Sequence, residues 1–168
     1  MNVLQLWVGD HDPEGQYADC VAHMKQFCFD YDIPYEFRFI PYHEVEGEHP
    51  ETIIKDTFIL NNAMKPEYKQ TCFVDCDLVL EPEFFSLPFV DNMPYCGYFQ
   101  NVPDSHLLYV NGASHYFKML KVAQDMREPD QSKYQYAFMS HVMRAFFGPL
   151  RKIPADVYEH LMLCYNNP

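Results

Sequence analysis

Residues 72–84, CFVDCDLVLEPEF, combine two features that rarely occur together. The segment is apolar and β-prone on both sides, which predicts a buried strand over residues 71–80. Asp75 and Asp77 nevertheless stand in its middle, where burial of an unpaired charge is costly. Either this pair binds something positive, or the strand ends there and the acids face water.

The composition indicates a globular chain that is not built to bind nucleic acid. Of its 168 residues, 48% are hydrophobic and 17% are aromatic, which allows a buried core and excludes a disordered chain. The formal net charge of −12 argues against a nucleic-acid binder and against docking on an anionic membrane surface. A chain this acidic would need a cation as intermediary to bind a phosphorylated ligand. We find no linker or internal repeat and expect one domain over residues 1–168.

The cysteines and the first residues favour a cytoplasmic protein with free thiols. The six cysteines show no C-x-x-C or zinc-ribbon spacing. The start MNVLQLWVGD lacks the basic region of a secretory signal, and no apolar run is long enough to span a membrane. We therefore expect no membrane span and a cytoplasmic location.

The first 80 residues alternate between strand and helix patterns. Apolar runs at 3–8, 35–42 and 71–80 flank two amphipathic helices, one opened by Pro13 and one over residues 51–64. This alternation predicts an α/β fold with a mostly parallel central sheet flanked by helices. Such sheets bind ligands beyond the carboxyl ends of their strands.

The second half carries shorter elements. Residues 95–100 and 107–110 are expected to form strands separated by a loop at 101–105. Apolar positions then recur at helical spacing over 113–123 and again over 134–145.

The Asp75–Asp77 pair suits a hard divalent cation. On one strand, the two carboxylates would converge on a single point of the ligand crevice. Mg²⁺ or Mn²⁺ typically keeps several waters at such a pair and takes its remaining ligands from substrate phosphates. The alternative is a strand end with two solvated acids. The apolar triplets on both sides of the motif favour the metal site.

Three segments together resemble the GT-A-type glycosyltransferases, closest to the DXD sugar-binding-region and glycogenin-like groups. CFVDCDLVLEPEFFSL is similar to their hallmark segment, apolar–apolar–Asp-x-Asp–apolar–apolar. ETIIKDTFILNNAM occupies the place of their S-D-x-x-R-type helix, with Asp56 matching the acid and Ile59 near the expected arginine. LLYVNGASHYFKML resembles a later strand that ends in asparagine. The resemblance covers residues 1 to about 125 in order and spacing.

This resemblance implies a shortened, single Rossmann-like GT-A domain. Residues 1–80 would form the nucleotide-binding half and residues 81–168 the sugar and acceptor half. The implied activity is a metal-dependent transfer of a sugar, of hexosyltransferase type, from a nucleoside-diphosphate sugar to a glycan or other acceptor. The chain is shorter than members of this family usually are, so elements that bind the acceptor are expected to be missing.

The resemblance also implies roles for individual residues. Asp77 would hold Mn²⁺ or Mg²⁺ directly, Asp75 would contact the ribose and orient the metal shell, and His160 is the candidate third metal ligand. The remaining implied contacts to the nucleotide-sugar are Val8, Gly9, Asp10, Asp56, Asn111 and Gly112. No base or nucleophile is assigned, so retention and inversion both stay open.

Two other functions remain open at this point. One is a non-catalytic relative that keeps the fold and binds sugars, nucleotides or a partner protein, which the short chain favours. The other is a phosphatase of the haloacid-dehalogenase type, whose site also opens with apolar–Asp-x-Asp. That type needs a glycine soon after the second acid, where this chain has Leu78 and Val79. The sequence does not indicate an oligomeric state.

Overall fold

The computed structural model describes residues 1–41, 50–99, 102–126, 143 and 150–160. The helix expected over residues 134–145 lies outside these residues, apart from Met143.

Helices and strands alternate through the first half of the chain, as predicted. The elements are β1 (Asn2–Gly9), α1 (Gln16–Asp30), β2 (Tyr35–Pro41), α2 (Pro50–Ala63) and β3 (Thr71–Asp75). The described part of the second half contains β4 (Leu78–Leu80), the short helix η2 (Pro82–Ser86), β5 (Tyr95–Phe99), β6 (Val102–Tyr109), α3 (Ser114–Asp125), β7 (Arg151–Lys152) and β8 (Tyr158–His160).

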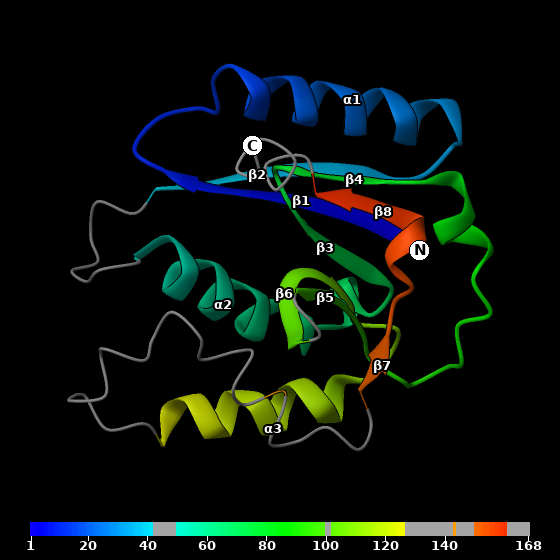
Figure 1. Ribbon diagram of the computed structural model, residues 1–168. Helices are drawn as coiled ribbons and strands as arrows, with labels where there is room; N and C mark the ends of the chain where they lie inside the picture. Colours follow the sequence, from blue (N-terminus) through cyan, green and yellow to red (C-terminus); the bar gives the residue numbers. More distant parts are fainter. Residues whose placement is uncertain (42–49, 100–101, 127–142, 144–149, 161–168) are drawn as a thin grey trace.

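A six-stranded sheet in the order β2-β1-β3-β6-β5-β7 forms the centre of the molecule (Figure 1). The pairs β1–β2, β1–β3 and β5–β7 are parallel, whereas β6 runs antiparallel to both β3 and β5. The predicted α/β fold with a mostly parallel sheet is therefore confirmed. A separate two-stranded ribbon joins β4 to β8 in antiparallel fashion.

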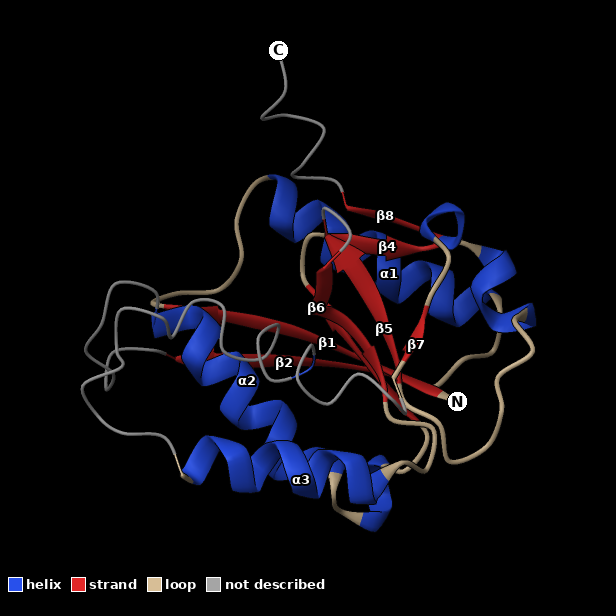
Figure 2. Ribbon diagram, turned by 60° about the horizontal axis from the view of Figure 1, so that its bottom comes forward, coloured by secondary structure: helices blue, strands red, loops and turns tan. Residues whose placement is uncertain are grey.

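Helices cover both faces of the sheet. Side chains of β1 alternate between the two faces, so Val3 packs with α1 residues while Leu4 and Leu6 pack with residues of α2 and α3. The helices α2 and α3 lie side by side on the face opposite α1 (Figure 2). The β4–β8 ribbon lies on the α1 side, next to that helix (Figure 1).

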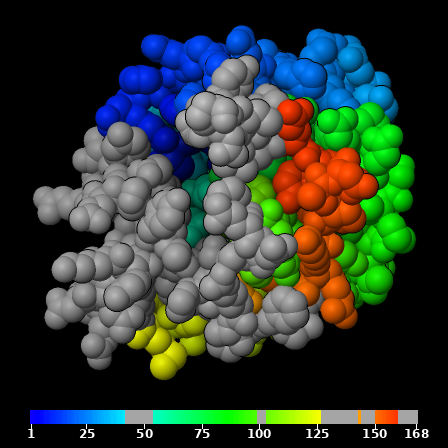
Figure 3. Space-filling model, in the orientation of Figure 1, coloured from blue at the N-terminus to red at the C-terminus, as the bar shows by residue number. Residues whose placement is uncertain are grey.

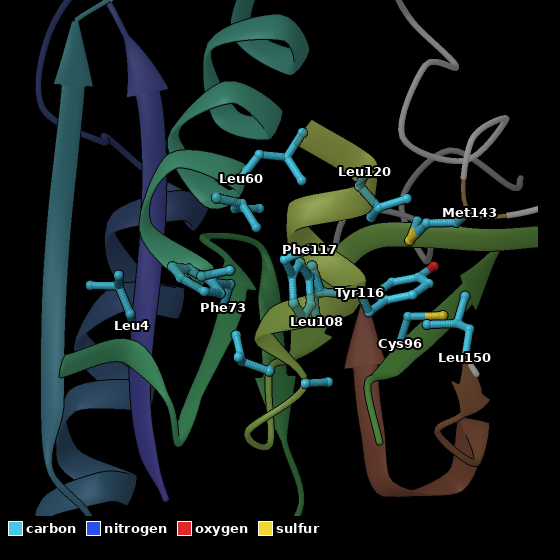
Figure 4. Close-up of a cluster of buried hydrophobic side chains, with 14 of the residues drawn as sticks. Leu4, Leu60, Phe73, Cys96, Leu108, Tyr116, Phe117, Leu120, Met143 and Leu150 are labelled. Atoms are coloured by element: carbon cyan, nitrogen blue, oxygen red, sulfur yellow. The ribbon is translucent and has the colours of Figure 1, made fainter. Parts of the chain in front are cut away.

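The larger core lies between the sheet and the helices α2 and α3. Phe73 of β3, Leu108 of β6 and Phe117 of α3 are fully buried and pack together there (Figure 4). Their burial joins the central strands to the helices that follow them in the chain, so the apolar periodicity seen in the sequence corresponds to this interface.

The segment 71–80 is not one strand, contrary to the expectation. β3 ends at Asp75, Cys76 and Asp77 form a turn, and the chain enters β4 at Leu78. Because β4 pairs with β8 and not with the central sheet, the apolar run continues without the strand continuing. All three residues of β4 are buried, which explains why the sequence reads as unbroken.

Two other boundaries differ from the expectation. α1 begins at Gln16, not at Pro13, because Gly15 adopts a φ of 55° just before the helix. The loop expected at 101–105 is wrong from Val102 onward, where β6 begins. The β5–β6 register shifts between Cys96 and Gly97, where a Cβ would lie 2.5 Å from His106 Nε2, so a larger residue at this bulge would displace the His106 ring.

Within the described ranges, no helix combines the length and the apolar character that crossing a bilayer requires. The five cysteines that the structure describes are free and buried. The expectation of free thiols is confirmed for these five residues.

We predict that Phe73→Ala lowers the free energy of unfolding by about 3–5 kcal/mol, because it leaves a cavity between the sheet and α2. Phe73 is completely buried. Urea denaturation followed by circular dichroism measures the change. The matched control is Phe29→Ala, since Phe29 is 78% exposed, and we expect its effect to stay within about 0.5 kcal/mol. Similar losses in both variants would contradict the core assignment.

Candidate functional site

The strand order creates a crevice at the carboxyl ends of β1 and β3. From β1 the chain passes through α1 to β2 on one side, and then through α2, on the opposite face, to β3 on the other side of β1. The order of the strands reverses between β1 and β3, and such a reversal leaves a crevice beyond the strand ends.

A pocket of about 190 Å³ occupies this crevice. The last pair in the β1–β3 ladder is Leu6 with Asp75, so β1 extends past the end of β3 and forms one wall. The first turn of α1 and the first half of α2 close the other sides. The lining residues are Leu6, Trp7, Val8, Tyr17, Lys55, Asp75, Cys76 and Asp77.

The buried carboxamide of Gln5 holds the turn that carries the acids. Its Nε2 donates hydrogen bonds to the carbonyl oxygens of Cys76 at 3.1 Å and Asp75 at 3.4 Å. Its Oε1 accepts a hydrogen bond from the Tyr35 hydroxyl at 2.8 Å. These bonds satisfy carbonyls that the end of the ladder leaves without strand partners, so the chain can turn here without a buried unpaired acceptor.

An ion pair joins the two faces of the pocket. Lys55 Nζ of α2 lies 2.8 Å from Asp75 Oδ2, and the two side chains are only 14% and 20% exposed. Burial alone would lower the pKa of the Lys55 ammonium, but the Asp75 carboxylate, helped by Asp56 and Asp104, outweighs burial and raises that pKa. The ion pair with Asp75 therefore favours the charged form of Lys55.

A second layer of acids lies beneath this ion pair. Asp56 is buried and accepts a hydrogen bond from the Ser105 hydroxyl at 2.8 Å. Burial raises the pKa of Asp56 to about 7, and Lys55 and Ser105 counteract it only in part. Burial also acts to raise the pKa of Asp104, but hydrogen bonds from His106 and the charge of Lys55 lower it to about 2. The site thus combines one ammonium with carboxylates of unlike acidity.

Aromatic side chains form the wall nearest to solvent. The rings of Trp7 and Tyr17 lie 4.8 Å apart between their centroids, and Trp7 Nε1 donates a hydrogen bond to the carbonyl oxygen of His11 at 2.7 Å. Burial, followed by the nearby Asp77 carboxylate, raises the pKa of the Tyr17 hydroxyl. Tyr17 therefore lies close enough to Asp77 to sense its charge.

Part of the expected site is brought together. Asp75, Asp77 and Val8 line one pocket, although the two acids come from a strand end and a turn and not from one strand face. Gly9 and Asp10 follow directly in the chain, and Asp10 is exposed. Asp56 lies under the pocket and does not line it.

His160 and the Asn111–Gly112 pair lie at different places relative to this pocket. His160 pairs with Leu78, the residue after Asp77, in the β4–β8 ribbon. The Gly112 amide donates to the Lys69 carbonyl, and the buried Asn111 side chain donates to the carbonyls of Val90 and Met93. Because β6 is antiparallel to β3, Asn111 and Gly112 lie at the end of the sheet opposite Asp75.

The pocket suits a cation that is shared with a substrate. Among the side chains that the structure describes, which do not include that of His160, no group of three or more His, Cys, Asp or Glu could hold a metal ion by itself. Asp77 and Asp75 offer two carboxylates to this pocket, and Lys55 pairs with Asp75. Such a donor set fits Mg²⁺ or Mn²⁺ when phosphate oxygens and water supply the remaining ligands.

Sequence reasoning missed four residues of the site: Gln5, Trp7, Tyr17 and Lys55. The signal for Lys55 was present, since it immediately precedes Asp56 on the helix that the resemblance had singled out. Consecutive helical residues point about 100° apart, so the basic side chain and not the acidic one faces the pocket.

We predict that the Asp56→Asn variant shows how the buried acid responds to pH. The pKa of Asp56 is 3.8 in the unfolded chain and about 7 in the folded chain. The neutral acid therefore contributes its full stabilisation below pH 3.8, and this contribution is lost as the pH rises to about 7. The stability of the native protein relative to Asp56→Asn should fall by about 1–4 kcal/mol between these values and then level off. Urea denaturation across this pH range measures it, with the exposed Asp91→Asn as control. Parallel pH curves for native protein and Asp56→Asn would refute it.

Comparison with solved structures places the fold among glycosyltransferases. A glycosyltransferase involved in the glycosylation of the major capsid of PBCV-1 superimposes with a TM-score of 0.58 at 15% identity, over 91% of this chain and 81% of that one. The catalytic domain of Drosophila beta1,4galactosyltransferase 7, in complex with xylobiose, gives 0.55 at 13% identity, over 96% and 71%.

Two further structures agree with this placement. A mutant of the same Drosophila enzyme, in complex with manganese, UDP-Gal and xylobiose, gives a TM-score of 0.56 at 11% identity, over 96% of this chain and 71% of that one. The apo form of the glycosyltransferase GlyE of Streptococcus pneumoniae TIGR4 gives 0.52 at 8% identity, over 91% and 45%. No protein-family model and no curated protein sequence matches this chain. The chain thus has the GT-A-like fold of solved glycosyltransferases.

Proposed function

We propose that this protein is a metal-dependent glycosyltransferase that binds a nucleoside-diphosphate sugar in the β1–β3 crevice and transfers the sugar to a glycan or other acceptor. The observation that supports this most is the meeting of Asp75 and Asp77 with Lys55 in one pocket at the reversal of the strand order. Structural neighbours that share the fold include a complex with manganese and UDP-Gal.

The chain's own residues divide the work of binding the donor. The Trp7–Tyr17 wall and the loop through Gly9 and Asp10 would hold the nucleoside, with the rings offering apolar faces to the base. Asp75 would accept a hydrogen bond from the ribose while Lys55 keeps its carboxylate in place. Exclusion of water by these side chains would strengthen each electrostatic contact in the pocket.

Mg²⁺ or Mn²⁺ would be held by Asp77, with Asp75 beside it and His160 as the candidate third ligand. Such an ion supplies a Lewis acid that stabilises negative charge on the departing diphosphate. Among the described residues that line the pocket, Lys55 carries the one cationic side chain, and it pairs with Asp75. An added cation would therefore offset the charge of a diphosphate next to these two carboxylates.

The experiment is a thermal-shift titration with Mn²⁺ and a panel of UDP- and GDP-sugars. We expect one nucleotide-sugar to raise the melting temperature only with the metal present, and Asp77→Asn to lower its affinity by about tenfold or more, since a charged ligand to the metal is lost. The exposed Asp91→Asn should bind as the native protein does.

Two outcomes would reject the proposal in different ways. If no nucleotide-sugar stabilises the protein with metal present and Asp77→Asn changes nothing, the donor site is wrong. If the donor binds but a radiolabelled sugar is neither hydrolysed nor transferred, the protein is a binding module that keeps the fold.

A further inference from the structure

We call the pocket in the β1–β3 crevice the donor pocket. A second and larger hollow lies outside it. It has a volume of about 550 Å³ and runs between α1 and the β4–β8 ribbon. One face of α1 lines it along its whole length, from Gln16 at the start to Tyr31 just after the end. Fifteen helical residues span about 22 Å, which is long enough for an extended ligand. We call this hollow the α1 groove.

The α1 groove has an apolar floor and hydrogen-bonding edges. Val79 and Leu80 of β4 form the floor with Cys20. The edges carry the carboxylates of Asp19, Glu81 and Glu159, the imidazole of His23 and the carboxamide of Gln16. None of the residues that line it in the described part of the chain is a lysine or an arginine.

Aromatic rings form the end of the groove that is farther from the donor pocket. Phe27 and Tyr31 lie 4.7 Å apart between ring centroids, and Phe85 of η2 backs Phe27 at 5.8 Å. Tyr31 is 55% exposed, so its ring is available to a ligand. A ring held in this way presents a flat, electron-rich face on which the C–H side of a sugar can stack.

The near end of the groove borders the donor pocket. Tyr17 lines the pocket, while its neighbour Gln16 and Cys20, one turn further along α1, line the groove. Burial and then the Asp77 charge raise the pKa values of both Tyr17 and Cys20, so both side chains lie near this carboxylate. β4 then leads from Asp77 into the groove floor.

We infer that the α1 groove binds a neutral oligosaccharide that serves as the acceptor, with its reactive end toward Asp77 and its far end on Phe27 and Tyr31. Carboxylate, amide and imidazole groups hydrogen-bond sugar hydroxyls, whereas the apolar floor and rings contact the C–H faces. The described lining residues include the carboxylates of Asp19, Glu81 and Glu159 and no lysine or arginine, which favours a neutral glycan over a phosphorylated or acidic one. The role as acceptor site rests on the proposed function, whereas the binding of sugar does not.

Orange and red residues of the 150–160 segment, which includes β8, lie at the molecular surface beside green residues of the segment after β4 (Figure 3). A glycan in the groove would thus be held between α1 and the ribbon. The ribbon borders both Asp77 and the groove, so it would help to bind the acceptor.

The test is a glycan array of neutral oligosaccharides, including xylobiose, together with uronic-acid and sialylated glycans, followed by calorimetry on the glycan that binds. We expect a neutral glycan to bind, and Phe27→Ala and Glu81→Gln each to weaken it by about tenfold, through loss of stacking and of a charged hydrogen bond. The matched controls are Phe29→Ala, on α1 like Phe27, and Glu83→Gln, two residues after Glu81. Both change exposed residues that do not line the groove, so both variants should bind within about twofold.

Asp77→Asn separates this inference from the proposed function. It should lose stabilisation by Mn²⁺ and the nucleotide-sugar yet still bind the neutral glycan. Glycan binding without any donor binding would reject the transferase and keep the groove. The inference is overturned if no neutral glycan binds, if acidic glycans bind better, if a lysine-rich peptide competes for the groove, or if Glu81→Gln and Phe27→Ala both bind as the native protein does.

Discussion

The reversal of strand order between β1 and β3 is the constraint on which the rest of the structure depends. Because α1 and α2 leave the sheet on opposite faces, the carboxyl ends of these two strands border a crevice, which the described residues line as a pocket. β1 runs past the last ladder pair, Leu6 with Asp75, and provides a wall. Asp75, Asp77 and Lys55 all line the pocket at this point, where β1 extends past the end of β3.

The local sequence pattern predicted the elements but not their directions or ends. Apolar periodicity marks which residues face a core, so it revealed β1, α1 and β3 and brought the acids to a strand end. It carries no information on the side chain of Gln5, which is 70 residues away from Asp75 in sequence and fixes where β3 stops. Nor does it encode that β6 runs antiparallel, which places Asn111 at the far edge of the sheet.

On α2, an error of one residue changes the chemical interpretation of the site. The resemblance directed attention to Asp56, whereas its neighbour Lys55 reaches Asp75. Asp56 instead packs under the pocket with Ser105, where burial keeps its proton to about pH 7. A pattern of residue types along a helix therefore locates the helix near a site more reliably than it names the side chain that enters it.

The ion pair with Lys55 also indicates that Asp75 and Asp77 have different roles. A partly buried carboxylate and ammonium at 2.8 Å stabilise each other, and removal of either leaves a costly unpaired charge. Asp75 is thus tied to the architecture of the pocket, in the same way as the carbonyls that Gln5 holds. Asp77 lies in the turn beyond, at the junction of the donor pocket and the α1 groove. Under the proposed function, Asp77 is accordingly the acid positioned to hold a cation for the donor, with Asp75 keeping the turn in place.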